Sequence, residues 1–386
     1  MLPKTLSEII ASHPNKCLGV LGLSYHHLPN RLKPCFLSMG DFPEDFQVDT
    51  WRLIQLWIAE GFIRTSSGRH ESLEEVAKHY LEDLISRNLI MARKKRFNGE
   101  VKVCGIHDLL REFCLIEAEM TKFMHVVRTP FSLAQKPNFR RFSIQKYISH
   151  KLLPPVARSI HCFSSLDLPF ESRIHGFFSS FNHLRVLAIF SALFVSFPLV
   201  IRKLFHLRYL QVQCSGNIPE SISELQNLQT LISDAYSLDM TLPRNIWMMK
   251  NLRCFKFIWE EISSTFIMLP HLEELKLKHC LADDDVWKLS DKDIFKSLKL
   301  LLLSDVNLKC WEARSDNFPN LKRLVLKKCK DLKKIPTNFG EIYSLELIEL
   351  HDCTTTAKAS VRKIKQEQDD LDNNILKVYI HNSYTN

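Results

Sequence analysis

Apolar residues recur at helical spacing through much of the first third of the chain. Residues 18–35 read as two short helical pieces, and residues 48–63 read as a helix with a broad apolar face that ends at Gly61. A third helix is predicted over residues 72–90. Its first residue, Ser72, is followed three positions later by a glutamate, which is the spacing of a capping box. The pattern predicts a cluster of three helices.

A basic hairpin is predicted directly after the third helix. Two extended runs meet at Asn98-Gly99, a strong signal for a tight turn between antiparallel strands. Three helices followed by such a hairpin predict a winged helix. Its basic run, Arg93–Arg96, could contact DNA phosphates, or it could be a solvated edge strand that its charges keep from aggregating.

The polar face of the third helix decides between these two interpretations. It is mostly acidic, with Glu71, Glu74, Glu75, Glu82 and Asp83. In a DNA complex these carboxylates would meet the phosphate backbone. We therefore expect no nucleic acid partner, and a DNA-binding regulator is only the third alternative for the function.

The rest of the chain carries a repeat. Leucines at positions 184, 207, 228, 252, 272, 298, 321 and 345 each open an LxxLxL-like strand, at intervals of 23, 21, 24, 20, 26, 23 and 24 residues. These intervals are typical of leucine-rich repeats, and "FRRFSI" and "ARSIHC" are weaker units ahead of them. The sequence thus predicts an α+β protein, with a helical winged-helix domain followed by an α/β leucine-rich-repeat solenoid, or horseshoe. The predicted parts are a residual N-terminal segment at 1–17, the winged helix at 18–122, a linker at 123–138 and the repeats at 139–386.

Alternation within each repeat strand predicts which side chains line the concave face of the solenoid. The residues expected there, as a surface for an acidic protein partner, are Phe190, Tyr209, Lys256, Ile258, Lys276, Lys278, Arg323, Lys327 and Lys328. Alternatively, the lysines only keep a solvated sheet soluble. Three cysteines, Cys280, Cys329 and Cys353, fall at the asparagine-or-cysteine position of the repeat, where a small buried residue is expected.

Composition excludes several classes of function. The chain has ten glycines and none of the glycine-rich phosphate loops, and its sixteen histidines form no HExxH or clustered metal-ligand set. We therefore expect no enzyme, no metal site and no cofactor held by this chain alone. Eleven cysteines without a CxxC pair indicate reduced thiols in the cytoplasm or the nucleus. The most apolar run, Val186–Ile201, is too short for a transmembrane helix.

The segment "VKVCGIHDLLREFC" places His107 beside Asp108 where an extended run changes into a helix. The pattern predicts Asp108 as the N-cap of that helix, with the imidazole of His107 near its positive end. A catalytic dyad would need a nucleophile or a third group, and the sequence offers none nearby.

Several blocks resemble the winged-helix portion of plant NLR immune receptors, the nucleotide-binding leucine-rich-repeat proteins, in particular their coiled-coil class of late-blight-resistance type. The blocks are "CFLSMGDFPED" at 35–45, "LWIAEGFI" at 56–63 and "IHD" at Ile106, His107 and Asp108, where the family has methionine, histidine and aspartate. The resemblance implies that His107 points at the β-phosphate of ADP in the intact receptor and that Asp108 organises the neighbouring turn. It also implies a phosphate-binding loop ahead of the winged helix, so ADP or ATP belongs to the intact family only.

The resemblance further implies a function. The solenoid would recognise a pathogen effector or a guarded host protein, and the winged helix would control a nucleotide switch together with an NLR nucleotide-binding domain. The alternative is a stand-alone leucine-rich-repeat adaptor or decoy that binds a protein without switching. Both place the chain in the cytoplasm, with the nucleus as a second compartment.

Overall fold

The computed structural model describes residues 16–65, 71–96, 98–128, 139–145, 156–164, 181–214, 216–233, 243–258, 264–279, 285–370 and 375–382. The chain forms two compact units, Met1–Ala192 and Leu193–Asn386. The boundary lies inside the repeats, whereas the predicted boundaries were at 122 and 139. The first unit joins the winged helix to the first repeat strands, and each unit is described by itself below.

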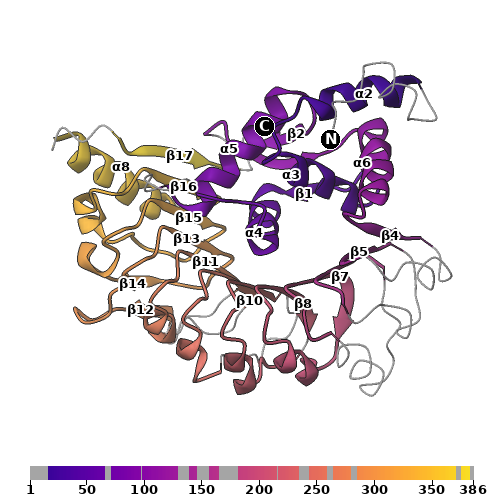
Figure 1. Ribbon diagram of the computed structural model, residues 1–386. Helices are drawn as coiled ribbons and strands as arrows, with labels where there is room; N and C mark the ends of the chain where they lie inside the picture. Colours follow the sequence, from indigo (N-terminus) through magenta and orange to yellow (C-terminus); the bar gives the residue numbers. More distant parts are fainter. Residues whose placement is uncertain are drawn as a thin grey trace. The chain divides into compact units, whose positions relative to one another are not determined.

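The winged helix of the first unit follows the predicted order (Figure 1). Its helices are α2 (Lys16–His26), α3 (Lys33–Leu37), the 3-10 helix η1 (Ser38–Asp41), α4 (Thr50–Glu60), α5 (Leu73–Ser86) and α6 (Asp108–Met120). Its small sheet has the order β1 (Val48–Asp49), β3 (Val101–Gly105) and β2 (Met91–Lys95), with antiparallel pairs.

Local signals in the sequence correctly placed the end of α4, the start of α5 and the turn of the wing, whereas α5 ends at Ser86 and not at residue 90 as predicted. Gly61 is the left-handed C-cap of α4, with φ 78°, a conformation that glycine adopts without steric cost. Ser72 and Glu75 form the capping box of α5 in both directions. Gly99, with φ 84°, turns the hairpin between β2 and β3. These three positions confirm the predicted end of α4, the predicted start of α5 and the wing.

Four parallel strands complete the first unit, namely β4 (His125–Val127), β5 (Arg141–Ile144), β6 (Ser159–Cys162) and β7 (Val186–Phe194). The weak units "FRRFSI" and "ARSIHC" are β5 and β6, as predicted. Strand β4 was not expected, because His125–Val127 lies in the predicted linker. Three residues are too few to show an alternating pattern. Residues 129–138 of that linker are outside the described part of the chain.

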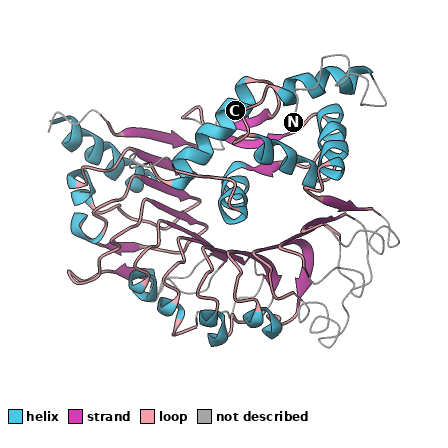
Figure 2. Cartoon of the chain, viewed as in Figure 1, coloured by secondary structure: helices cyan, strands magenta, loops and turns pink. Residues whose placement is uncertain are grey.

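In the second unit each strand begins two residues after its opening leucine, as the period predicts. Figure 2 shows these strands on one side of the coils and short helices on the other. The strands are β8 (Tyr209–Cys214), β9 (Thr230–Ser233), β10 (Cys254–Ile258), β11 (Glu274–Lys278), β13 (Leu300–Ser304), β15 (Arg323–Lys327) and β16 (Leu347–His351). The 3-10 helices are η4 (Leu199–Lys203), η5 (Glu220–Glu224), η6 (Ile246–Met248), η7 (Ser264–Met268), η9 (Ser315–Asn317) and η10 (Thr337–Glu341).

The core of the array is built from its leucines. All eight opening leucines are at most 2% exposed, so the period of the sequence is the period of the buried core. Two short strands, β12 (Val286–Lys288) and β14 (Cys310–Glu312), form a separate parallel pair. The array ends with α8 (Thr355–Asp370) and β17 (Lys377–His381), which pairs with β16. The sequence reading did not predict β12, β14, α8 or β17.

Two of the three repeat cysteines occupy the small buried position that was predicted for them. Cys329 is 1% exposed and Cys353 is 6% exposed, and the thiol of each donates to backbone carbonyls. Cys280 lies outside the described residues. The nine cysteines whose side chains the structure describes are free thiols.

Candidate functional site

The turn from β3 into α6 carries the Ile106, His107 and Asp108 motif. Ile106 is buried, while His107 and Asp108 are exposed. The structure corrects the predicted cap. The N-cap of α6 is His107, whose Nδ1 accepts a hydrogen bond of 3.3 Å from the backbone N–H of Leu109, and Asp108 is the first helical residue. The prediction favoured aspartate because carboxylates are common caps, but Asp108 already has helical backbone geometry.

The cap has a consequence for the imidazole. A ring nitrogen that accepts a hydrogen bond carries no proton, so neutral His107 has its proton on Nε2. That N–H is not used by the cap and is free to donate to an exposed acceptor. Asp108 adds a carboxylate to the first turn of α6, where negative charge is favourable. The turn therefore presents one donor and one carboxylate to solvent.

A second group of polar residues lies where η1 meets the first repeat strands. Asp41, in the "GDFPED" block at the end of η1, is 4% exposed. Its Oδ2 lies 2.5 Å from Nδ1 of His161 in β6, an ion pair between side chains that are only 6% and 5% exposed. The backbone carbonyl of Asp41 accepts hydrogen bonds from Ser143 Oγ at 2.5 Å and Gln145 Nε2 at 3.0 Å. One residue of the winged helix is thus held by three residues of the repeats.

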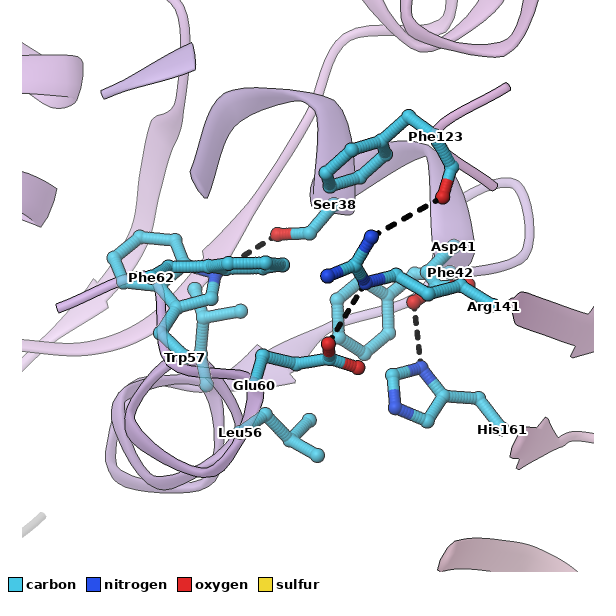
Figure 3. A pocket seen from close by; sticks show the side chains of 11 residues that line it. Ser38, Asp41, Phe42, Leu56, Trp57, Glu60, Phe62, Phe123, Arg141 and His161 are labelled. Carbon is cyan, nitrogen blue, oxygen red and sulfur yellow. Dashed lines mark hydrogen bonds and ion pairs between the residues drawn. The ribbon is translucent and has the colours of Figure 1, made fainter. Parts of the chain in front are cut away.

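A second ion pair lies beside the first (Figure 3). Glu60, the last residue of α4, accepts a 2.7 Å hydrogen bond from Nε of Arg141 in β5. The guanidinium also lies over the rings of Phe62, at 5.1 Å, and Phe123, at 4.7 Å from the ring centroids. The same side chain donates to the Phe123 carbonyl at 3.4 Å. Arginine suits this place because its planar group pairs with a carboxylate and stacks on aromatic faces at once.

Four phenylalanines close the apolar side of this contact. Phe163 and Phe190 are stacked with centroids 4.5 Å apart, and Phe46 packs edge-on against both, at 5.2 and 5.8 Å. Phe42 stacks on Phe46 at 5.6 Å. This corrects one sequence prediction. Phe190 was expected to face a foreign partner, but it contacts the winged helix of its own chain.

We call the contacts of Asp41, Glu60, Arg141, His161 and the four phenylalanines the junction. Its polar groups set the charge of His161. Burial alone lowers the pKa of His161, but the charge and hydrogen bond of Asp41 and the charge of Glu60 outweigh burial, and the resulting pKa is raised. The charge of Arg141 opposes this rise. The imidazole is therefore held in its charged form against Asp41.

The other predicted concave-face residues belong to the second unit and are less accessible than expected. Tyr209 is 0% exposed and donates to Gln211 Oε1 at 2.8 Å. Lys256 and Lys276 are each 8% exposed, and Lys276 pairs with Glu274 at 3.0 Å. These three side chains do not form the open patch that the alternation predicted.

The remaining predicted residues differ among themselves. Lys278, Arg323 and Lys327 are half-buried, and Arg323 lies 3.4 Å from Glu349. Lys328 follows the end of β15, has φ 52° and is exposed, so it belongs to the turn that leaves the sheet. Ile258 ends β10, and its side chain is outside the described part of the structure. Partner binding by these residues stays a prediction.

Comparison with known proteins agrees with both parts of the fold. The winged-helix model of disease resistance proteins matches residues 42–114, and a leucine-rich-repeat region model matches residues 156–316. Over both parts the chain is similar to disease resistance proteins, and its curated relatives are late blight resistance proteins.

The curated relatives come from Solanum demissum. The late blight resistance protein homolog R1B-11 is 32% identical over 93% of this chain and 32% of its own length. The homolog R1B-23 is 30% identical over 92% of this chain and 38% of its length, and the late blight resistance protein R1-A is 28% identical over 92% and 37%. The chain thus spans about a third of the length of the relatives that it matches. In the described part of the chain, no helix is long and apolar enough to cross a membrane.

Sequence reading missed the junction. Its residues come from the "CFLSMGDFPED" and "LWIAEGFI" blocks and from the two weakest repeat units. The blocks carried the resemblance, but they do not indicate that Asp41 pairs with a residue 120 positions away or that Glu60 pairs with one 81 positions away. The available signal for these contacts was that two basic residues, Arg141 and His161, occupy concave positions of the two weak repeat units.

Proposed function

We propose that the chain acts as the winged-helix and leucine-rich-repeat portion of an intracellular plant immune receptor. In this proposal the repeats recognise a protein, either a pathogen effector or a guarded host protein, and the winged helix controls a nucleotide switch. The chain acts by binding and not by catalysis. The observation that carries the proposal is the junction, because it ties the repeat strands directly to the helices of the winged helix.

The chemistry of the junction suits a coupling element. A buried ion pair has one good geometry, and losing one partner leaves an uncompensated charge away from water. The pairs Asp41–His161 and Glu60–Arg141 therefore favour one docked arrangement of η1 and α4 on β5 and β6 over intermediate ones. A displacement of the repeat strands would break these ion pairs and so remove contacts that hold the winged helix. Coupling by discrete contacts of this kind is how packed elements transmit a change.

The Ile106, His107 and Asp108 turn supports the nucleotide part of the proposal. Its exposed Nε2–H donor and the N-terminus of α6 are suited to an anionic group such as a phosphate. These residues fit one edge of a nucleotide site, and the chain has no glycine-rich loop to supply the other edge. ADP or ATP would be held together with the nucleotide-binding domain of the receptor. When bound there, the nucleotide would supply the switch chemistry, and the Nε2–H of His107 would be available to donate to one of its oxygens.

The compartment we propose is the cytoplasm, with the nucleus as second choice. The free thiols of the described cysteines suit a reducing compartment. The partner is a protein, and the acidic polar face of α5, which carries Glu74 and Glu75 in its first turn, does not favour DNA.

A graft tests the nucleotide role. This chain, placed behind the nucleotide-binding domain of a plant NLR receptor, should show faster ADP release and spontaneous cell death in leaves with Asp108→Val. The matched control is Glu112→Val, which removes one exposed carboxylate from the same helix. The control should behave as the unchanged graft. Equal effects of both variants would mean that only helix charge matters, and no effect of either would favour the adaptor or decoy without switching.

A further inference from the structure

Three arginines stand in register at one edge of the first unit. Arg140, Arg158 and Arg185 each come directly before the first residue of β5, β6 and β7. The backbone N–H of Arg158 donates to the Arg140 carbonyl at 2.7 Å, and that of Arg185 donates to the Arg158 carbonyl at 2.7 Å. Neighbouring strands lie about 4.8 Å apart, so the three side chains start at about that spacing. We call Arg140, Arg158 and Arg185 the arginine ladder.

Among the described residues, no carboxylate lies opposite the arginine ladder. In the described residues no carboxylate forms an ion pair with any of its three members. Burial lowers the pKa of Arg158, and the charges of Arg140, Arg185 and Arg141 lower it further. The neighbouring Arg141, by contrast, pairs with Glu60. Arg140 is exposed, and Arg158 and Arg185 are half-buried, so a ligand can reach the row.

In the second unit, several residues that directly precede a strand have partners of opposite charge. There Arg253 pairs with Glu273 at 2.7 Å, and Glu273 also pairs with Lys299 at 2.9 Å. Further along, Lys322 lies 3.4 Å from Glu346. At this position the second unit also has Arg208 and Gln229, while its later repeats carry charges of both signs that pair with one another. Three like charges side by side repel one another in the free protein, so an acidic partner that docks on them would relieve this repulsion.

We propose that the arginine ladder is a docking surface for an acidic helix of a partner protein. Carboxylates at positions i, i+4 and i+7 of a helix form a row with neighbours about 5–6 Å apart. This matches the strand spacing of the ladder better than the roughly 6.7 Å between same-face residues of an extended peptide. Guanidinium groups bind carboxylates with two parallel hydrogen bonds, which gives the pairing direction and register.

The proposal is separate from the proposed function. The ladder precedes the strands and lies outside the concave-face positions, and docking there requires neither a nucleotide nor an effector. Nucleic acid is the competing ligand, since phosphates also bind guanidinium groups. The spacing favours the helix, and the experiment separates the two.

The test uses the whole chain and two synthetic helical peptides of equal composition. One carries glutamates at i, i+4 and i+7, and the other distributes the same glutamates around the helix. The unchanged protein should bind the first peptide about tenfold more tightly than the second, with the difference shrinking between about 50 and 200 mM salt. Equal binding of both peptides would overturn the proposal.

Two double variants identify the surface. Arg140→Glu with Arg185→Glu should lose about tenfold or more in affinity for the first peptide. Lys330→Glu with Lys334→Glu makes the same change in net charge at exposed lysines of the second unit and should stay within about twofold. An equal loss in both would show attraction by net charge alone. Tighter binding of a single-stranded DNA of matched charge, abolished by the ladder variant, would make the site a nucleic acid surface.

Folding of the ladder variant is checked by amide hydrogen exchange in β5, β6 and β7. If the exchange of these strands accelerates, the variant Arg140→Gln with Arg185→Gln replaces it, because glutamine removes the charge without introducing repulsive carboxylates. Full peptide binding by that glutamine variant, with normal exchange, would also refute the ladder.

Discussion

Removal of either member of the Asp41–His161 pair should loosen the winged helix from the first repeat strands. The side chains are 6% and 5% exposed and 2.5 Å apart, so neither can recover water when its partner is lost. Breaking a buried pair by removing one partner costs about 3–5 kcal/mol. Asp41→Ala leaves a charged or newly neutral imidazole in the junction, and His161→Ala leaves a carboxylate there. Each single variant should therefore fall in this range.

The double variant gives the sharper expectation. With both groups gone no charge is left buried without its partner, so the double variant should cost little more than the worse single variant, a coupling of at least about 2 kcal/mol. A pair that is partly exposed should behave differently. Glu119 and His125 in the same unit lie 2.9 Å apart with 35% and 8% of their side chains exposed, and their coupling should be about 1 kcal/mol or less.

The pair should also make stability depend on pH. The folded-state pKa of His161 is raised above 6.5, so the folded state binds the proton more tightly than the unfolded state. The contribution of His161 is then fully present below pH 6.5 and is lost as the pH rises through the raised pKa. Asp41 and Glu60 cause the rise against burial and the charge of Arg141, and Ser159 Oγ lies 3.4 Å from the other ring nitrogen. In Asp41→Ala this pH dependence should disappear or reverse.

The measurement is amide hydrogen exchange of β5, β6 and η1, which reports local opening without requiring that the whole chain unfold in one step. The free energy of local opening is compared for the parent, the two single variants and the double variant. Each is measured at one pH below 6.5 and at one pH above the raised pKa of His161. Additive single variants, with no coupling between Asp41 and His161, would refute the role of the pair. A slope against pH that survives in Asp41→Ala would refute the explanation of the pKa.

Two further predictions concern the backbone and the repeats. Gly61→Ala should cost about 1 kcal/mol and lower the melting temperature, because the backbone φ of 78° disfavours any residue with a side chain. The added Cβ would clash with nothing within 4 Å, so the backbone conformation alone causes the loss. A thermal scan unaffected by the change would contradict this. Tyr209→Phe should cost about 1–3 kcal/mol, measured by urea unfolding of the second unit, because Gln211 would lose the donor to its buried Oε1. A Leu210→Val change in the same strand gives the scale of simple packing loss, and a Tyr209→Phe variant as stable as the parent would show that water replaces the hydroxyl.

The repeats could be predicted from sequence because one physical cause produces both the pattern and the fold. The opening leucines recur because each coil must bury the same positions, so their period locates the strands of both units. The concave face was harder. Alternation predicts to which face of the sheet a side chain points, but it does not predict which other residues of the chain pack on that face. Phe190 is in contact with Phe46, and Lys276 with Glu274, and neither contact leaves a trace in the spacing.

The candidate site shows the same limit. The Ile106, His107 and Asp108 turn was located correctly, and the error of one residue in its cap arose because a histidine nitrogen replaced the expected carboxylate. The junction could not be predicted at all, since Asp41 and His161 are brought together only by the docking of η1 on β6. Contacts between elements far apart in the chain depend on the folded arrangement, and local patterns do not contain it.

The position of β4 has a mechanical consequence. Only four residues separate the end of α6 at Met120 from the first strand of the array at His125, and the backbone N–H of Phe123 is bonded to the Ala118 carbonyl at 2.8 Å. The Phe123 carbonyl in turn receives the Arg141 guanidinium. These hydrogen bonds tie the short connection to both α6 and β5. We therefore expect a rotation of the first repeat strands to be transmitted to α6, whose N-cap is His107.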